Sequence, residues 1–369
     1  MGPHDIKKHT DYVLPFDSNI GLACINEVLI CNVSILGLNI SKLEIVVFGE
    51  GDEAGICDST IFFYKSLFGR SRSRFLGKLL NINLPVPLRR KIFGFLVNNY
   101  LYDEHSYDGQ SREDKIKQFE ERHANSLDSY KSIGELFTRS IRPSDIQFQG
   151  LDDPNSISSP CEGRVVEFGE IYTDKCVQVK SSTFKVSELL QENFGSLIDS
   201  SSLFYVTIYL SPKDYHRFHS PSDIEIKNVK HISGECFPVF KGIASKLNNL
   251  FSINERVVIN SRWEHGKMYI IAIAAHGVSD IKLFCVPNLQ TNQRGFGLNY
   301  LTGNNGKIVE YSNFKSCTNQ GNYLKGEELG LFNLGSTIIL VFQAPKDYKF
   351  TVDRGEKLKL GQIIGKVSN

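Results

Sequence analysis

The sequence lacks the cysteine spacing that marks many metal-binding and disulfide-rich proteins. Its eight cysteines include no C-x-x-C pair, which argues against a zinc ribbon and against a disulfide scaffold. No run of eighteen or more uninterrupted apolar residues occurs, so no transmembrane helix is predicted. The formal net charge is only +1, and the chain as a whole therefore gives no reason to expect a nucleic-acid partner. A globular protein in a reduced compartment is the first expectation.

Three regions of different composition predict an α+β fold. Residues 1–60 read as a small leader that is rich in β-structure. Residues 61–147 contain apolar clusters, basic residues and charged stretches typical of helices, and Pro85 and Pro87 divide the first part into two helices. Residues 148–369 contain many short apolar runs separated by Gly, Asn and Ser turns. This last pattern predicts a β-rich domain of mainly antiparallel sheets.

The first helical stretch combines apolar residues with many positive charges. This pattern is typical of helices that lie at a membrane surface, although an ordinary surface helix packed on a core has a similar composition. On an anionic leaflet, each basic residue near the surface would contribute about 1 kcal/mol. The residues predicted to contact lipid are Arg70, Arg72, Arg74, Lys78, Arg89, Arg90 and Lys91.

The segment "YLSPKDYHRFHSP" places two histidines, His216 and His219, in a proline-bounded loop after a predicted strand. Two histidines do not make a catalytic zinc site, because such a site needs a third protein ligand. No H-E-x-x-H pattern is present either, and no metal is predicted. Paired histidines are more often structural than catalytic, but a loop after a strand is a common address for site residues.

Two other segments add a carboxylate and a nucleophile. "SSPCEGRV" places Glu162 in a turn, and "LFNLGSTIILVF" places Ser336 at the start of an apolar strand. Taken together, Glu162, His219 and Ser336 could act as acid, base and nucleophile. The serine does not lie in a G-x-S-x-G elbow. It follows Gly335 directly and could attack the carbonyl of that residue, an intramolecular acyl shift favoured by proximity. A plain strand that begins after a glycine would give the same four letters.

The chain resembles the phosphatidylserine decarboxylase family over roughly residues 61–369, with the family's motifs in their usual order. The matching segments are YKSIGELFTRSIRP, SSPCEGRV, YLSPKDYHRFHSP, NERV, KGEELGLFNLGSTIILVF and LGQIIGKV. One departure from the family pattern concerns Glu162, because the family has S-P-x-D-G where this chain has Ser159-Pro160-Cys161-Glu162-Gly163. The longer side chain carries the carboxylate one methylene further from the backbone.

The resemblance implies a self-processing, pyruvoyl-dependent carboxy-lyase that converts phosphatidylserine to phosphatidylethanolamine and CO₂. Cleavage between Gly335 and Ser336 would leave a β chain ending at 335 and an α chain of residues 336–369. Ser336 would become the covalent pyruvoyl cofactor, which serves as an electron sink. His219, held by Glu162, would be the base for cleavage. His216 would return a proton to the carbon that loses CO₂, a step that His219 could perform instead.

The implied partners are phosphatidylserine in an anionic membrane and the chain's own two fragments, with no nucleic acid and with homo-oligomers left open. We expect peripheral association with the endoplasmic reticulum, another endomembrane or a cytoplasmic leaflet, and we rank the mitochondrial inner membrane lower. Two other functions remain open. One is a serine hydrolase that uses Ser336, His219 and Glu162 on an external ester, and the other is a lipid-binding relative that does not cleave itself.

Overall fold

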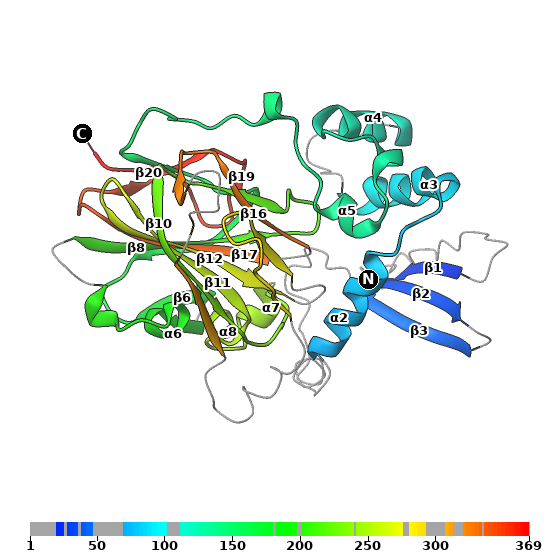
Figure 1. Cartoon of the computed structure of the whole chain (residues 1–369), viewed down its shortest axis with the longest axis horizontal. Helices are drawn as coiled ribbons and strands as arrows, with labels where there is room; N and C mark the ends of the chain where they lie inside the picture. The colour runs from blue at the N-terminus through cyan, green and yellow to red at the C-terminus, as the bar shows by residue number, and fades with distance from the viewer. Residues whose placement is uncertain are drawn as a thin grey trace, which may run out of the picture. The chain divides into compact units, whose positions relative to one another are not determined.

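A computed structural model describes most of the chain (Figure 1). The described residues are 20–25, 28–35, 38–46, 69–101, 111–179, 182–197, 201–239, 241–275, 280–292, 307–312, 314, 320–333 and 336–368. The chain divides into two compact units, Met1–Ala54 and Gly55–Asn369. In the first unit, an antiparallel sheet is formed by β1 (Ile20–Ile25), β2 (Val28–Ile35) and β3 (Leu38–Val46). Everything that follows concerns the second unit.

Within the described residues, nine strands of the second unit form one antiparallel sheet. In spatial order its strands are β14 (Ile308–Tyr311), β10 (Ile224–Ile232), β11 (Arg256–Trp263), β12 (Gly266–Ala274), β17 (Ser336–Ala344), β8 (Ser202–Leu210), β5 (Gly163–Glu170) and β19 (Lys357–Leu358), and β15 (Asn322–Tyr323) pairs with β10. β17 lies in the interior of this sheet, hydrogen-bonded to β12 on one side and to β8 on the other. The strand that carries the predicted nucleophile is therefore held from both sides.

Both faces of the main sheet are covered, which explains why β17 is an unbroken apolar run. Successive side chains of a strand point to opposite faces, and Ile338 and Leu340 join one buried cluster while Ile339 and Val341 join another. The second cluster is closed by three short helices, which Figure 1 shows along one side of the sheet. These helices are α6 (Val186–Leu190), α7 (Lys241–Ala244) and α8 (Leu250–Ile253).

Smaller sheets complete the β-rich part. One sheet joins β13 (Ile281–Leu283), β16 (Glu328–Phe332) and β9 (Arg217–His219), and another joins β18 (Lys349–Phe350), β20 (Ile363–Lys366) and β4 (Ser156–Ser158). Most of their buried apolar residues belong to the first buried cluster. A two-stranded ribbon of β6 (Lys175–Val179) and β7 (Ser182–Lys185) contributes to the second cluster.

Four other helices precede the β-rich part along the chain. They are α2 (Gly69–Leu80), α3 (Val86–Leu96), α4 (Arg112–Arg122) and α5 (Ile133–Phe137), and a π-helical turn over Val97–Leu101 follows α3. Pro85 precedes α3 and Pro87 lies in its first turn, where a missing N–H costs no helical hydrogen bond. The prolines thus separate two helices, as the sequence predicted. Ser111 and Ser132 cap α4 and α5 by accepting hydrogen bonds from Asp114 N and Glu135 N.

These elements make the α+β fold that the sequence predicts, with few helices and a β-rich part of antiparallel sheets. In the part of the chain that the structure describes, no helix is long and apolar enough to cross a membrane. The region boundaries near residues 60 and 147 stay predictions. The chain divides into compact units once, between Ala54 and Gly55.

Candidate active site

Ser336 is the first residue of β17 and lies at the end of the main sheet where β17 begins and its two neighbours, β12 and β8, end. It pairs with Ala274, the last residue of β12, and with Leu210, the last residue of β8. The Ser336 side chain is buried, and its hydroxyl has no hydrogen-bond partner among the described residues. The predicted cleavage partner Gly335 lies outside the described residues. Ser336 is thus a buried hydroxyl at the edge where β8 continues into the histidine-bearing loop.

That loop, residues 211–216, is held by its own polar groups. The Asp214 carboxylate accepts hydrogen bonds from the backbone N and the hydroxyl of Ser211, both at 2.7 Å. His216 Nδ1 lies 2.7 Å from the Asp214 carbonyl oxygen. A carbonyl only accepts, so Nδ1 carries the proton and the neutral imidazole keeps its lone pair on Nε2. Nε2 is buried and has no partner in the described part of the chain.

The environment of His216 strongly favours the neutral imidazole. Burial, and then the positive charge of Arg139, lower the pKa of His216 to about 3. The ring of Phe137 meets the imidazole edge-on, with 5.8 Å between the ring centroids. A group in this state accepts a proton at Nε2 before it can donate one.

A backbone ladder ties the histidine loop to the segment that precedes Ser336. The carbonyl oxygen of His216 accepts a hydrogen bond from Phe332 N at 2.8 Å, and β9, which follows His216, pairs with β16, which ends at Phe332. Only residues 333–335 separate the end of β16 from Ser336. Two segments more than a hundred residues apart in sequence are thus joined directly beside the predicted cleavage point.

His219 has a different set of partners. Its Nδ1 donates to the Gly326 carbonyl oxygen at 2.8 Å, and its Nε2 lies 3.3 Å from the Tyr215 hydroxyl. Because a carbonyl only accepts, Nδ1 carries the proton, and the hydroxyl of Tyr215 donates to the lone pair on Nε2. Burial is the main cause that lowers the pKa of His219. The imidazole of His219 is neutral and engaged at both nitrogens, whereas that of His216 is engaged at one.

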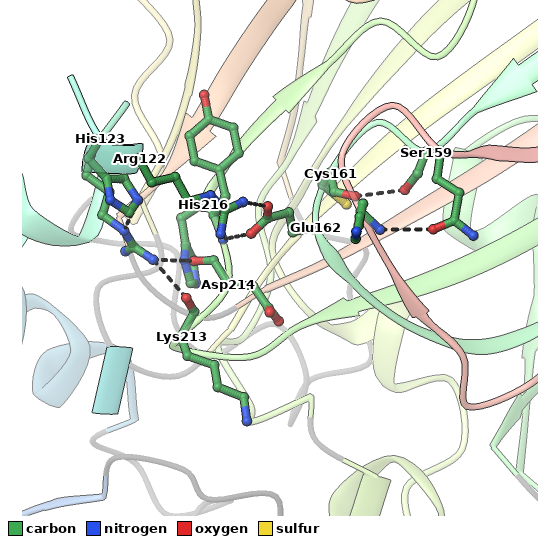
Figure 2. Close-up of polar contacts among 12 residues, drawn as sticks. Arg122, His123, Ser159, Cys161, Glu162, Lys213, Asp214 and His216 are labelled. Atoms are coloured by element: carbon green, nitrogen blue, oxygen red, sulfur yellow. Dashed lines mark hydrogen bonds and ion pairs between the residues drawn. The ribbon is translucent and has the colours of Figure 1, made fainter. Parts of the chain in front are cut away.

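Glu162 lies in a turn that contacts His219 through the backbone. His219 N donates to the Pro160 carbonyl oxygen at 2.8 Å. The Glu162 carboxylate forms an ion pair with Arg122, the last residue of α4, and accepts a hydrogen bond from Tyr215 N at 3.1 Å (Figure 2). Among the described residues, no hydrogen bond joins Glu162 to His219. Tyr215 bridges them instead, because its backbone N contacts Glu162 and its hydroxyl contacts His219.

The sequence reasoning missed the arginine that holds the histidine loop. Arg139 is only 3% exposed. Its Nη2 donates to the carbonyl oxygens of Lys213 and Asp214, at 2.8 and 3.2 Å, and its Nε donates to His123 Nε2 at 3.0 Å. Arg139 lies in the matched segment YKSIGELFTRSIRP, but its partners are mostly backbone groups, which leave no side-chain pattern in the sequence.

A second buried polar pair lies at the same sheet edge. Glu255, just before β11, accepts hydrogen bonds from His231 Nε2 at 2.8 Å and from Asn292 N at 2.9 Å. Its carbonyl oxygen accepts from Ala274 N, and Ala274 pairs with Ser336. Glu255 therefore belongs to the same cross-strand row as Ser336, with one small residue between them. The sequence offered a signal for this pair, because Glu255 is part of the NERV segment.

Comparison with known proteins identifies similar chains. A family model described as phosphatidylserine decarboxylase matches residues 133–366. The phosphatidylserine decarboxylase proenzyme of Plasmodium knowlesi is 34% identical over 347 residues, which cover 92% of this chain and 91% of that protein. The proenzyme of Plasmodium falciparum is 36% identical, covering 84% and 79%. A mitochondrial proenzyme of Cricetulus griseus is 29% identical, covering 83% and 73%.

Proposed function

Since the chain belongs to the phosphatidylserine decarboxylase family, we propose that it converts phosphatidylserine to phosphatidylethanolamine and CO₂ with a pyruvoyl group made from Ser336. The observation that carries this proposal is the position of the Ser336 hydroxyl in the fold. It is buried at the start of β17, has no hydrogen-bond partner among the described residues, and lies at the sheet edge where the histidine loop begins.

The proposed maturation rearranges the chain's own atoms. A base takes the Ser336 hydroxyl proton, Oγ attacks the Gly335 carbonyl carbon, and the peptide C–N bond breaks to give an ester and a free amine. Removal of the Ser336 Cα proton then breaks the Cβ–Oγ bond, which leaves a carboxylate on Gly335 and dehydroalanine at position 336. One water hydrolyses the tautomeric imine, ammonia leaves, and a pyruvoyl group remains. His219 is the proposed base, and Glu162 its proposed support.

The surroundings of Ser336 suit such a group. After cleavage, the fragment 336–369 would still contain β17, which is paired with β12 and β8 and buried on both faces. The two fragments would therefore stay together without a covalent link. The pyruvoyl group supplies an electrophilic carbonyl and an electron sink for the carbanion formed when CO₂ leaves. The buried Nε2 of His216 is the proposed carrier of the proton that this carbon needs.

We further propose that the helical part docks on the membrane that holds the substrate. Four large apolar side chains on or between α2 and α3 are exposed: Phe75, Ile82, Val86 and Leu88. We call these four residues the apolar ridge. Exposed apolar residues beside positive charges suit insertion into an anionic interface.

The contacts of the basic residues refine the lipid-facing set. Arg90 forms ion pairs with Glu120 and Asp128, each at 3.2 Å, and Arg89 donates to the carbonyl oxygens of Leu84 and Asp128. These two arginines contribute to the fold. The side chains of Arg70 and Arg72 lie outside the described residues. The electrostatic part of the proposal therefore relies most on Lys78 and Lys91. These two lysines lie near the apolar ridge in sequence, and among the described residues they make no ion pair or hydrogen bond of the kind that holds Arg89 and Arg90.

The names of similar proteins bear on which membrane the chain would dock on. Relatives from Toxoplasma gondii, Cricetulus griseus and Schizosaccharomyces pombe carry "mitochondrial" in their names. The expectation that ranks the mitochondrial inner membrane below other membranes therefore has no support. We propose peripheral association with a phosphatidylserine-containing leaflet and leave the organelle open.

Self-cleavage is the experiment that tests the function. The purified chain should run as two fragments on a denaturing gel, with an intact mass that places a pyruvoyl group at position 336, and should release CO₂ from phosphatidylserine vesicles. Ser336→Ala should remain one chain without activity. Thr337→Val is the matched control, because the Thr337 hydroxyl is also buried without a described partner, and this variant should still be cut.

The base is tested in the same assay. His219→Ala should stay uncut, because a neutral serine is a weak nucleophile, whereas His216→Ala should be cut but should decarboxylate poorly. An uncut, phosphonate-sensitive chain would point to the serine hydrolase instead. An uncut chain that binds vesicles but releases no CO₂ would point to the lipid-binding relative.

A further inference from the structure

Arg139 is a buried cation that the proposed mechanism does not yet use. Its guanidinium lies 5.4 Å from the centre of the Phe119 ring, and among the described residues it bonds only to carbonyl oxygens and to a neutral histidine nitrogen. No carboxylate within the described residues lies at ion-pair distance from it. Burying a charge without a counterion is costly, and burial lowers the pKa of Arg139 to about 10. A cation kept at such cost beside the histidine loop calls for a reason.

The reason we find is a shared acceptor. The Asp214 carbonyl oxygen accepts hydrogen bonds from Arg139 Nη2 at 3.2 Å and from His216 Nδ1 at 2.7 Å. The second bond from Nη2, to the Lys213 carbonyl oxygen, fixes the preceding peptide as well. Arg139 thus holds the peptide that sets the orientation and the tautomer of the His216 ring.

The other groups around the His216 ring do not offset this cation. From α5, Phe137 presents the edge of an aromatic ring. From β16, Phe332 N bonds to the backbone carbonyl of His216 and not to its ring. Within the loop, the Asp214 carboxylate is turned to the backbone N and hydroxyl of Ser211. The charged group that acts most directly on the imidazole is therefore Arg139, and a positive neighbour disfavours imidazolium.

We propose that Arg139 is a positioning residue that keeps His216 neutral, with its proton on Nδ1 and its lone pair on Nε2. This inference rests on the proposed function. In decarboxylation, the amine of the substrate must lose a proton before it acts as a nucleophile, and the α-carbon must gain a proton after CO₂ leaves. The lone pair on Nε2 of a neutral His216 can accept the first proton, and because the cation disfavours imidazolium, His216 readily passes that proton on to carbon, so the protons balance.

Nitrogen NMR tests the proton position without any cofactor. The sample is the Ser336→Ala chain with ¹⁵N-labelled histidine, and the signal of His216 is assigned by its loss in a His216→Gln variant. We expect an Nδ1-protonated neutral ring that does not titrate between pH 8 and pH 5. An Nε2-protonated ring, or titration near the ordinary pKa of about 6.5, would overturn the proposal whatever the enzyme's activity.

A substitution then tests the part played by Arg139. Arg139→Met removes the cation but keeps most of the length of the side chain. Because burial, the larger cause, still favours the neutral ring, we expect the pKa of His216 in the same background to rise above that of the parent chain, in a titration extended below pH 5. Arg139→Lys keeps the charge and should keep the ring neutral, which covers the case in which the methionine variant does not fold. A ring that behaves alike in the methionine variant and the parent would refute the role.

Activity gives an independent readout. With the ring still buried, loss of the cation should move the acid limb of the kcat/KM profile of mature Arg139→Met to a higher pH than in wild type, in step with the pKa of His216 measured by NMR. The matched control is Arg256→Met, because Arg256 is also buried and also donates to backbone carbonyl oxygens, those of Glu188, Leu189, Ser252 and Asn254. Its profile should follow wild type. If no variant or wild-type chain decarboxylates while the NMR result holds, the proposed function fails and the tautomer assignment stands.

Discussion

At Glu162, one extra methylene changes which groups a carboxylate can reach. The side chain extends to Arg122 at the end of α4 and to Tyr215 N in the histidine loop. The same carboxylate thereby links the helical part to the loop that carries His216. If Glu162 supports His219, the proposed base, it does so in this structure through Tyr215, whose hydroxyl donates to His219.

This link makes a prediction about maturation. Glu162→Gln is nearly isosteric, but it loses the charge that pairs with Arg122 and that would stabilise a histidinium ion. Loss of the orienting carboxylate costs about 10⁴ in rate in a serine-protease triad, so cleavage should slow severely, whereas Glu162→Asp should still be cut. The measurement is the cut fraction against time after a short expression pulse. Glu167→Gln is the control, because Glu167 also pairs with an arginine, Arg354; equal rates for wild type and Glu162→Gln would remove Glu162 from the mechanism.

Residues of this kind differ in how far the sequence reveals them. Ser336, His216 and His219 could be proposed from the sequence because their side-chain chemistry and their segments are distinctive. Arg139 and Tyr215 could not, because each makes a contact that involves a backbone group. Arg139 contacts the carbonyl of Lys213 across 74 positions, and Tyr215 offers a peptide N–H to Glu162. No side-chain pattern in one sequence records which peptide group a side chain will meet.

At the level of elements, the apolar ridge makes the docking proposal testable. Full burial of a large apolar side chain contributes about 1.5–3 kcal/mol, so removing two half-exposed ones should weaken membrane binding by about tenfold or more. The variant Phe75→Ser with Val86→Ser should therefore sediment less with phosphatidylserine-containing vesicles, with cleavage unchanged.

The matched control carries two equally exposed leucines from outside the helices. Leu151→Ser with Leu324→Ser removes similar exposed apolar area and should leave vesicle binding as it is in wild type. Equal losses in both double variants would mean that binding follows general surface hydrophobicity. Unchanged binding in the ridge variant would show that the ridge is not the docking element.

The elements also show where sequence patterns stop. The run at 338–342 predicts a buried strand, and β17 is one. Continuous apolar strands are typical of parallel sheets covered on both faces, yet β17 is antiparallel to both of its neighbours. The reason is that helices α6 to α8 cover one face and the small sheets cover the other. The sequence of a strand predicts how many of its faces are buried. It does not predict which strands pair with it, because those strands come from segments far away in sequence.

For the whole molecule, the titratable groups buried around the site predict how stability depends on pH. In the folded chain, burial is the main cause that lowers the pKa of His123 to about 2 and that of His216 to about 3. Unfolding restores values near 6.5. Between pH 6 and pH 4 the unfolded chain therefore binds about two more protons at these sites, and the stability they contribute above pH 6.5 is lost as the pH falls.

Asp214 works in the opposite direction. Burial raises its pKa to about 6. Between about pH 6 and pH 4, Asp214 therefore holds a proton in the folded chain but is ionised in the unfolded chain. Its contribution to stability is present at low pH and is lost as the pH rises through 6. The three groups together leave the unfolded chain with about one extra proton between pH 6 and pH 4. As the pH is lowered from 6 to 4, protonation of these groups should reduce the free energy of unfolding by about 1.4 kcal/mol per pH unit.

A single substitution isolates one of these protons. In His123→Gln, the amide can donate to the Phe119 carbonyl and accept from Arg139 Nε, as the neutral imidazole does, but it cannot take up a proton on unfolding. Urea unfolding of Ser336→Ala, an uncut chain, at pH 6, 5 and 4 should give a slope that is steeper than that of the double variant by about 1.4 kcal/mol per pH unit. Parallel slopes would mean that His123 is protonated alike in the folded and unfolded chains. The buried cluster of two neutral histidines, His123 and His216, around the Arg139 cation would then not exist as described, and acid would have to act on the protein through other groups.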